Sequence, residues 1–288
     1  MTAFSEHFHT APDGVRTYYR RYPARSGRDR RPVLCMHGLT RNSRDFEDVA
    51  PRIADRGRTV IAVDVRGRGK SDYDPDAENY TPATYVEDMA GLLESVGWRE
   101  IVALGTSMGG LMTMIMAAAH PGVIKAAAMN DIGPVIDPKG LTRIQGYVGG
   151  GGPYDSWEAA AEAVRGINRV AFPNQTDPSF WIAFARRICR QREDGLIELD
   201  YDPAISKPVQ SGDVAPPDLW PLFDALAPVP LLLVRGALTD LLAMETVEEM
   251  QRRSPTMTLA QVPDVGHAPL LTEPVAEAAL DAFFDEVD

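Results

Sequence analysis

The sequence predicts an α/β fold in which helices cover both faces of a mostly parallel sheet. Short apolar runs of strand length alternate with helical segments through the first and last thirds of the chain. Parallel strands need long crossovers, so this alternation is typical of a parallel sheet between helices. The 288 residues, 44% hydrophobic and 24% charged, suit one globular core domain.

An antiparallel hairpin is expected at the start, followed by alternating strands and helices. The expected strands are 4–10, 16–22, 33–37, 59–65, 101–104 and 124–129, and the expected helices are 44–56, 81–96 and one that ends near His120. Pro82 suits the first turn of its helix because its missing N–H costs no hydrogen bond there, and Gly97 lies just past the end.

The alternation stops between Pro134 and about Leu226, where Pro and Gly are frequent and helices are expected at 156–170 and 179–192. This predicts a core of residues 1–133 and 227–288 with a helical cap, 134–226, inserted over the sheet. Aromatic side chains in such a segment more often pack in a core than line a pocket. A cap must nevertheless bury something beneath it, and Tyr147, Trp157 and Trp181 are the expected substrate-binding residues.

The last third resumes the α/β pattern. The run 229–234 is almost purely apolar, which is typical of a strand buried on both faces. A helix at 246–253, a strand at 257–262 and a helix at 274–284 are expected to complete the sheet.

A serine nucleophile is predicted at Ser107. The segment Gly105-Thr106-Ser107-Met108-Gly109 fits G-x-S-x-G and lies directly between an apolar strand and an apolar helix. On such a turn the serine is held in a strained backbone conformation with its hydroxyl exposed. A serine hydroxyl is a weak nucleophile, so a base and an orienting acid are also required.

The base is expected to be His267, which comes late in the chain, as the order serine, acid, histidine requires. Two aspartates compete for the acid role, since each follows a strand that ends at the same sheet edge as Ser107. Asp240, in the loop after 229–234, is the first choice, and Asp131, at the end of the strand after the nucleophile helix, is the alternative.

An acyl-transfer site also needs donors for a developing oxyanion. The N–H of Met108, directly after the nucleophile, is one expected donor. The N–H of Leu39 is the other, because Gly38 lets the loop after an early strand turn toward the site. His37 is expected to be a structural hydrogen-bonding residue.

These motifs occur in the order found in one family, and the sequence resembles the α/β-hydrolase superfamily. The matching segments are His37-Gly38, 64–72 with the form D-x-R-G-x-G-x-S-D, 105–110, Asp240 and Gly266-His267. The resemblance implies an eight-stranded sheet with one antiparallel strand, a helical cap between the sixth and seventh strands, no cofactor and serine hydrolase chemistry. Ser107 at the elbow, where haloalkane dehalogenases and epoxide hydrolases have aspartate, excludes those two classes.

The resulting hypothesis is a serine hydrolase of the carboxylesterase or lactonase type that cleaves a small, largely apolar ester or lactone through an acyl-enzyme. Two alternatives remain: a carbon–carbon bond hydrolase of a vinylogous diketone, and a non-catalytic ligand receptor on the same fold.

Composition limits the partners. Lys and Arg number 29 against 41 Asp and Glu, and the net charge of −12 disfavours nucleic acid. Neither the two cysteines, Cys35 and Cys189, nor the histidines have metal-ligand spacing, so no metal is expected. The absence of a signal-peptide pattern and of an apolar run of about 18 residues predicts a cytoplasmic protein without a membrane partner. A homodimer is left open.

Overall fold

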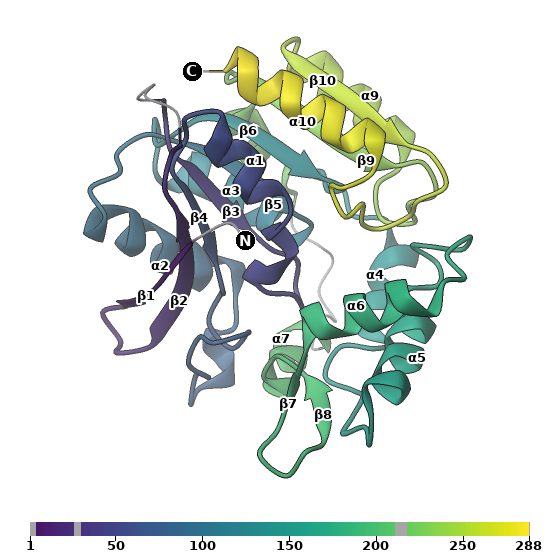
Figure 1. The fold of residues 1–288 in the computed structure, drawn as a ribbon. Coiled ribbons are helices and arrows are strands. Elements are labelled where there is room, and N and C mark those ends of the chain that lie inside the picture. The colour runs from purple at the N-terminus through teal and green to yellow at the C-terminus, as the bar shows by residue number, and fades with distance from the viewer. Residues whose placement is uncertain (1–3, 26–29, 211–217, 288) are drawn as a thin grey trace.

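An eight-stranded sheet lies at the centre of the computed structural model, which describes residues 4–25, 30–210 and 218–287 (Figure 1). In spatial order its strands are β1 (Ser5–Thr10), β2 (Arg16–Tyr22), β4 (Val60–Val63), β3 (Val33–Met36), β5 (Ile101–Thr106), β6 (Ile124–Asn130), β9 (Leu231–Gly236) and β10 (Met257–Val262). Only β2 runs against the others, since it pairs antiparallel with both β1 and β4. This confirms the mostly parallel eight-stranded sheet expected from the sequence.

Two helical layers cover the sheet. One face carries α1 (Val49–Asp55) and α10 (Pro274–Glu286), and the other carries α2 (Pro82–Ser95), α3 (Met108–Ala119), α8 (Trp220–Leu226) and α9 (Met244–Arg253). Alternate residues of β3 enter opposite layers: Leu34 and Met36 pack with α2 and α3, while Val33 and Cys35 pack with α1. A strand covered on both faces must be apolar at every position, which explains the unbroken apolar runs.

The segment between β6 and α8 leaves the sheet and lies over its edge (Figure 1). It contains α4 (Pro138–Gln145), α5 (Trp157–Asn168), α6 (Pro178–Ile188), the hairpin of β7 (Cys189–Gln191) and β8 (Ile197–Leu199), η3 (Pro203–Ile205) and α7 (Ser206–Gln210). The helix expected at 179–192 ends at Ile188 because Cys189 takes an extended conformation and begins the hairpin.

The last helix of the expected cap contacts the core. Helix α8, which the sequence analysis assigned to the cap of residues 134–226, packs against α3. Its Phe223 and Leu226 join the hydrophobic core on the face of the sheet that α2 and α3 cover. This helix therefore belongs by its contacts to the core layer. Residues 211–217 of the expected cap lie outside the described residues.

The expected helix 44–56 is divided into two pieces, η1 (Ser43–Phe46) and α1. Asn42 caps η1 by accepting a hydrogen bond from the N–H of Arg44. A further short helix, η2 (Ala77–Asn79), precedes α2.

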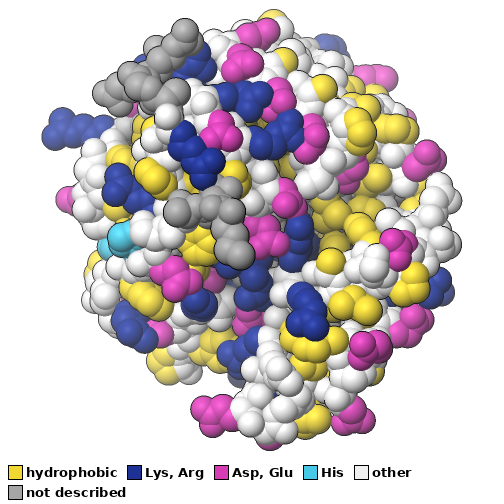
Figure 2. Space-filling view, in the orientation of Figure 1, with side chains coloured by type: hydrophobic (Ala, Val, Ile, Leu, Met, Phe, Trp, Pro, Cys, Tyr) yellow, Lys and Arg dark blue, Asp and Glu magenta, His cyan; other side chains and the backbone are white. Residues whose placement is uncertain are grey.

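Charges of both signs are interspersed on the face shown in Figure 2, which presents no single basic patch. Within the described part of the chain, no helix has both the length and the apolar character needed to cross a membrane.

A buried ionic cluster follows β4, in the segment 64–72. The guanidinium of Arg66 binds both carboxylate oxygens of Asp88 at 2.5 and 2.7 Å, and it binds Asp74 at 2.5 Å. All three side chains are at most 3% exposed. Charges removed from water in this way need partners, so the cluster ties the loop after β4 to α2.

Replacing Asp88 by Ala is expected to lower the free energy of unfolding by about 3–5 kcal/mol, because the Arg66 charge stays buried without its main partner. Chemical denaturation measures the change. Asp55→Ala, which breaks the exposed pair of Arg25 and Asp55, is the control and should cost less than about 1 kcal/mol. Equal effects of the two substitutions would show that the cluster is not structurally important.

Candidate active site

Ser107 lies on a sharp turn from β5 into α3. Its φ of 51° is in the left-handed region, which is strained for a residue with a side chain. The turn needs glycine on both sides, since an added Cβ at Gly105 would overlap the carbonyl of Gly109, and one at Gly109 would overlap the carbonyl of Met36. The N–H of Ser107 donates to the backbone carbonyl of Asn130 at 2.9 Å, so the turn is also tied to the neighbouring strand β6.

A continuous series of hydrogen bonds runs from Ser107 through His267 to Asp131. Ser107 Oγ lies 2.9 Å from Nε2 of His267, and Nδ1 of His267 lies 2.8 Å from Oδ2 of Asp131. The carboxylate of Asp131 is fully buried, and its other oxygen accepts from the N–H of Gly236 at 2.9 Å. In this arrangement the imidazole can accept the serine proton while the carboxylate fixes its orientation.

Asp240, the first choice for the acid, makes no hydrogen bond to His267 among the described residues, whereas Asp131 does, and this contradicts the preference for Asp240. Its two oxygens accept from Nε and Nη2 of Arg143, on α4, at 2.6 and 2.7 Å. The hydrogen bonds from Arg143 lower the pKa of Asp240 below its ordinary value. The alternative, Asp131, lies beside His267, and the end of β6 is tied to the histidine loop because Nδ2 of Asn130 donates to the carbonyl of Pro269 at 2.8 Å.

The expected oxyanion donors flank the serine. A Cβ added to Gly38 would lie 3.7 Å from Ser107 Cβ, so the loop after β3 passes directly beside the nucleophile. Among the hydrogen bonds of the described residues, none uses the N–H of Leu39 or of Met108. The carbonyl of Leu39 accepts from Nε of the buried Arg68 at 2.9 Å, which fixes the direction of this loop. Both N–H groups are thus available to a ligand oxygen.

His37 has the structural role expected for it. Its Nε2 accepts from the N–H of Val65 at 3.0 Å, so Nδ1 carries the proton and donates to the carbonyl of Gly38 at 2.7 Å. Burial lowers the pKa of His37 to about 3, so the ring is neutral at physiological pH.

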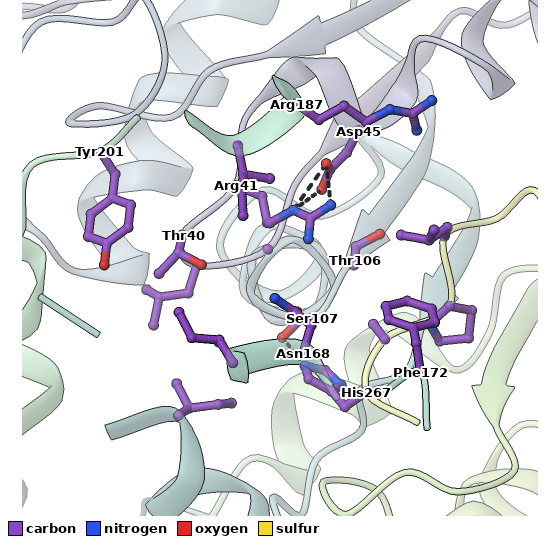
Figure 3. A pocket seen from close by; sticks show the side chains of 18 of the residues that line it. Thr40, Arg41, Asp45, Thr106, Ser107, Asn168, Phe172, Arg187, Tyr201 and His267 are labelled. Atoms are coloured by element: carbon purple, nitrogen blue, oxygen red, sulfur yellow. Dashed lines mark hydrogen bonds and ion pairs between the residues drawn. The ribbon is translucent and has the colours of Figure 1, made fainter. Parts of the chain in front are cut away.

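A pocket opens over Ser107 and His267 between the core and the inserted segment (Figure 3). Tyr147, one of the three expected substrate-binding aromatics, lines it. Trp157 and Trp181 do not line the pocket, which contradicts the prediction that they bind the substrate. The Trp157 ring lies against the guanidinium of Arg186, 4.5 Å from the ring centroid, and Trp181 is buried with its Nε1 donating to the carbonyl of Gln175.

The pocket wall contains both polar and apolar residues, whereas the sequence analysis expected a largely apolar substrate. Polar residues that the sequence analysis missed contribute to it: Thr40, Arg41, Asp45, Asn168, Arg187 and Tyr201. Arg41 could have been found, since it comes two residues after the expected oxyanion donor Leu39. The other polar residues lie on helices and loops whose orientation toward the pocket is set only by the tertiary structure.

No cluster of three or more His, Cys, Asp or Glu side chains is placed to hold a metal ion within residues 4–25, 30–210 and 218–287. The two cysteines, Cys35 and Cys189, are both buried as free thiols.

Comparison with known proteins places the chain among hydrolases. The sequence profile of the alpha/beta hydrolase fold family matches residues 31–274. A 3-hydroxybutyrate-oligomer hydrolase from Cupriavidus necator is 36% identical over 265 residues, which cover 88% of both chains. A 2-(acetamidomethylene)succinate hydrolase from Mesorhizobium japonicum is 28% identical and covers 89% of this chain and 87% of its own length.

Solved structures agree. The crystal structure of an alpha/beta hydrolase from Novosphingobium aromaticivorans superposes with a TM-score of 0.93 at 42% identity, covering all of both chains. A putative hydrolase from Rickettsia typhi has a TM-score of 0.86 at 23% identity, over 99% of this chain and all of its own, and supports the fold alone.

The two aspartates are expected to affect the reactivity of Ser107 very differently. Asp131→Asn should slow covalent modification of Ser107 by a fluorophosphonate by about 10³–10⁴-fold, because the amide no longer orients His267 or stabilises its cation. Asp240→Asn should change this rate less than about tenfold. The rate of adduct formation, followed by intact-mass spectrometry, distinguishes them, and a reversed order would return the acid role to Asp240.

His37 is expected to make the stability of the fold pH-dependent. Its folded pKa of about 3 lies below the ordinary value of 6.5, so below pH 6.5 the unfolded chain binds a proton that the folded chain does not. The free energy of unfolding should therefore fall as pH decreases from about 6.5, by up to about 1.4 kcal/mol per pH unit from this residue.

The test compares the wild type with His37→Gln by chemical denaturation between pH 7 and pH 4. The variant should be less stable at pH 7 because it loses buried hydrogen bonds. The difference should narrow toward pH 4, where only the wild type bears the cost of a neutral buried imidazole. A difference that stays constant across this range would contradict the assignment.

Proposed function

The chain belongs to the alpha/beta hydrolase family, and from this premise we propose that it is a serine hydrolase that cleaves a carboxylic ester through an acyl-enzyme. The hydrogen-bonded series of Ser107, His267 and Asp131 is the main support, because each contact has the distance and order that nucleophile activation requires. The buried carboxylate gives the imidazole a fixed partner when it becomes charged.

In the first half of the reaction, His267 Nε2 takes the hydroxyl proton as Ser107 Oγ attacks the ester carbonyl carbon. The N–H groups of Leu39 and Met108 donate to the oxyanion of the tetrahedral intermediate, and each such donor is worth about 3 kcal/mol of barrier. When the intermediate collapses, the bond to the leaving oxygen breaks, and His267 gives its proton to the departing alcohol.

In the second half, a water molecule replaces the alcohol. His267 removes a proton from this water as the oxygen attacks the acyl-enzyme carbonyl, and the same two N–H groups hold the second oxyanion. Collapse releases the carboxylic acid and returns the proton to Ser107. Asp131 holds the imidazole in position and stabilises the imidazolium at each step.

Short esters of hydroxy acids are the first substrates to test. A relative of 36% identity over most of both chains is a 3-hydroxybutyrate-oligomer hydrolase. Such oligomers are joined by ester bonds, so cleavage requires no chemistry beyond the scheme above. Cyclic esters, the lactones, would pass through the same acyl-enzyme, with the leaving alcohol still attached.

Ser107→Ala is expected to abolish the fluorophosphonate adduct and to lower kcat for p-nitrophenyl acetate and butyrate by about 10⁴-fold or more, while leaving the fold intact. Intact-mass spectrometry and stopped-flow release of p-nitrophenol measure the two effects. Ser95→Ala, in the last turn of α2 and away from the pocket, is the matched control and should label and turn over as the wild type does.

Full turnover by Ser107→Ala would refute the proposal. A folded wild type that binds ligand saturably but gives neither an adduct nor a product would support a non-catalytic receptor instead. Product analysis separates ester hydrolysis, which yields an acid and an alcohol, from carbon–carbon hydrolysis of a vinylogous diketone.

A further inference from the structure

Arg41 shares a wall of the pocket with the nucleophile. It comes from the loop between β3 and η1, and a Cβ added to Gly38 would lie 3.5 Å from Arg41 Cγ and 3.7 Å from Ser107 Cβ. The two side chains thus flank the same glycine. Figure 3 shows the guanidinium of Arg41 beside Asp45 in this pocket, with Ser107 and His267 across from it.

The hydrogen bonds of Arg41 leave one edge of its guanidinium unused. Nε donates to both oxygens of Asp45 at 3.1 and 2.9 Å, and Nη2 donates to Oδ1 at 2.7 Å. The Phe184 ring covers one face of the guanidinium, with its centroid 4.4 Å from Cζ. Nη1 donates to no group among the described residues, so the edge formed by Nη1 and the second hydrogen of Nη2 stays free.

The free edge has the geometry that a carboxylate requires. Two parallel N–H donors on a planar cation match the two oxygens of a carboxylate. Asp45 and Phe184 hold the plane of the guanidinium fixed, so little side-chain entropy is lost when a ligand binds. The Arg41 and Asp45 side chains line the pocket and are only 16% and 13% exposed, so the pair is largely shielded from bulk solvent.

The second arginine of the pocket is differently placed. Arg187 pairs with Glu47 at 3.1 Å and with Asp48 at 2.5 Å, so its guanidinium is bound by two carboxylates outside the pocket wall. Arg41 is therefore the cation best placed for a ligand near Ser107. Since Asp45 offsets part of its charge, we expect preference for an anion and not exclusion of neutral esters.

We propose that Arg41 binds a carboxylate of the substrate, which makes the protein selective for esters that carry a free carboxylate a few bonds from the ester group. This inference rests on the proposed ester hydrolysis. The carboxylate can belong to the alcohol part, as in an ester of 3-hydroxybutyrate, or to the acyl part, as in a half-ester of succinate.

Two substrate pairs of equal shape test the proposal. In each pair a carboxylate is replaced by an isopropyl group. For the alcohol part, 3-acetoxybutyrate is compared with 4-methylpentan-2-yl acetate, and for the acyl part, monoethyl succinate is compared with ethyl 4-methylpentanoate. The wild type is expected to have a higher kcat/KM for the anionic ester in one pair, mainly through a lower KM, and the pair that shows it identifies the part that carries the carboxylate.

Arg41→Gln should lower the ratio of anionic to neutral kcat/KM by about 10- to 100-fold, the loss expected for charge-assisted hydrogen bonds. Arg41→Gln combined with Asp45→Asn should give the same loss without leaving a carboxylate unpaired, which guards against misfolding of the single variant. Arg143→Gln is the matched control, since Arg143 makes an equally bidentate pair with Asp240 and does not line the pocket, and it should keep the wild-type ratio.

The outcomes separate this inference from the function beneath it. Fluorophosphonate labelling with turnover of neutral esters, but no anionic preference in either pair, would overturn the role of Arg41 and leave the serine hydrolase intact. An equal loss of the ratio in Arg41→Gln and Arg143→Gln would also overturn it. Absence of both labelling and turnover would instead refute the proposed function.

Discussion

The close approach of α3 to strands β3 and β5 is the constraint on which the candidate site depends. Gly109 lies against the carbonyl of Met36, and no side chain fits between them. Met36 is paired with Gly105 in the sheet register, so the loop that follows β3 must pass beside Ser107. This one packing contact therefore determines both the strained backbone of Ser107 and the positions of the Leu39 and Met108 N–H groups beside it.

The register of the remaining strands extends this alignment to the acid. Thr106 pairs with Asn130, and Asn130 pairs with Val234, so β5, β6 and β9 end at one edge of the sheet. Carboxyl ends of parallel strands form the usual site edge of α/β proteins. Asp131 and Asp240 both follow strands of this edge, which explains why both were candidates.

Much of the sheet and the serine–histidine pair could be predicted from the sequence, because strand patterns, the G-x-S-x-G turn and the chain order are local properties. The choice between Asp131 and Asp240 could not be predicted, since it depends on Arg143, which lies in another segment of the chain and donates to both carboxylate oxygens of Asp240. The positions of Trp157 and Trp181 could not be predicted for a similar reason. Trp157 and Trp181 lie on helices with apolar faces, but the sequence does not say which partner each face meets.

The inserted segment is joined to the core at several separate places. The bonds join Arg143 to Asp240, Ala171 to Gly266 and Asp200 to Arg44. A rigid rotation of the whole segment away from the sheet would break all of them at once, and the costs of distant, independent contacts add. Substrate entry and product release should therefore need only small gating movements. The width of a molecule should limit its entry into the pocket more than the rate of a large conformational opening does.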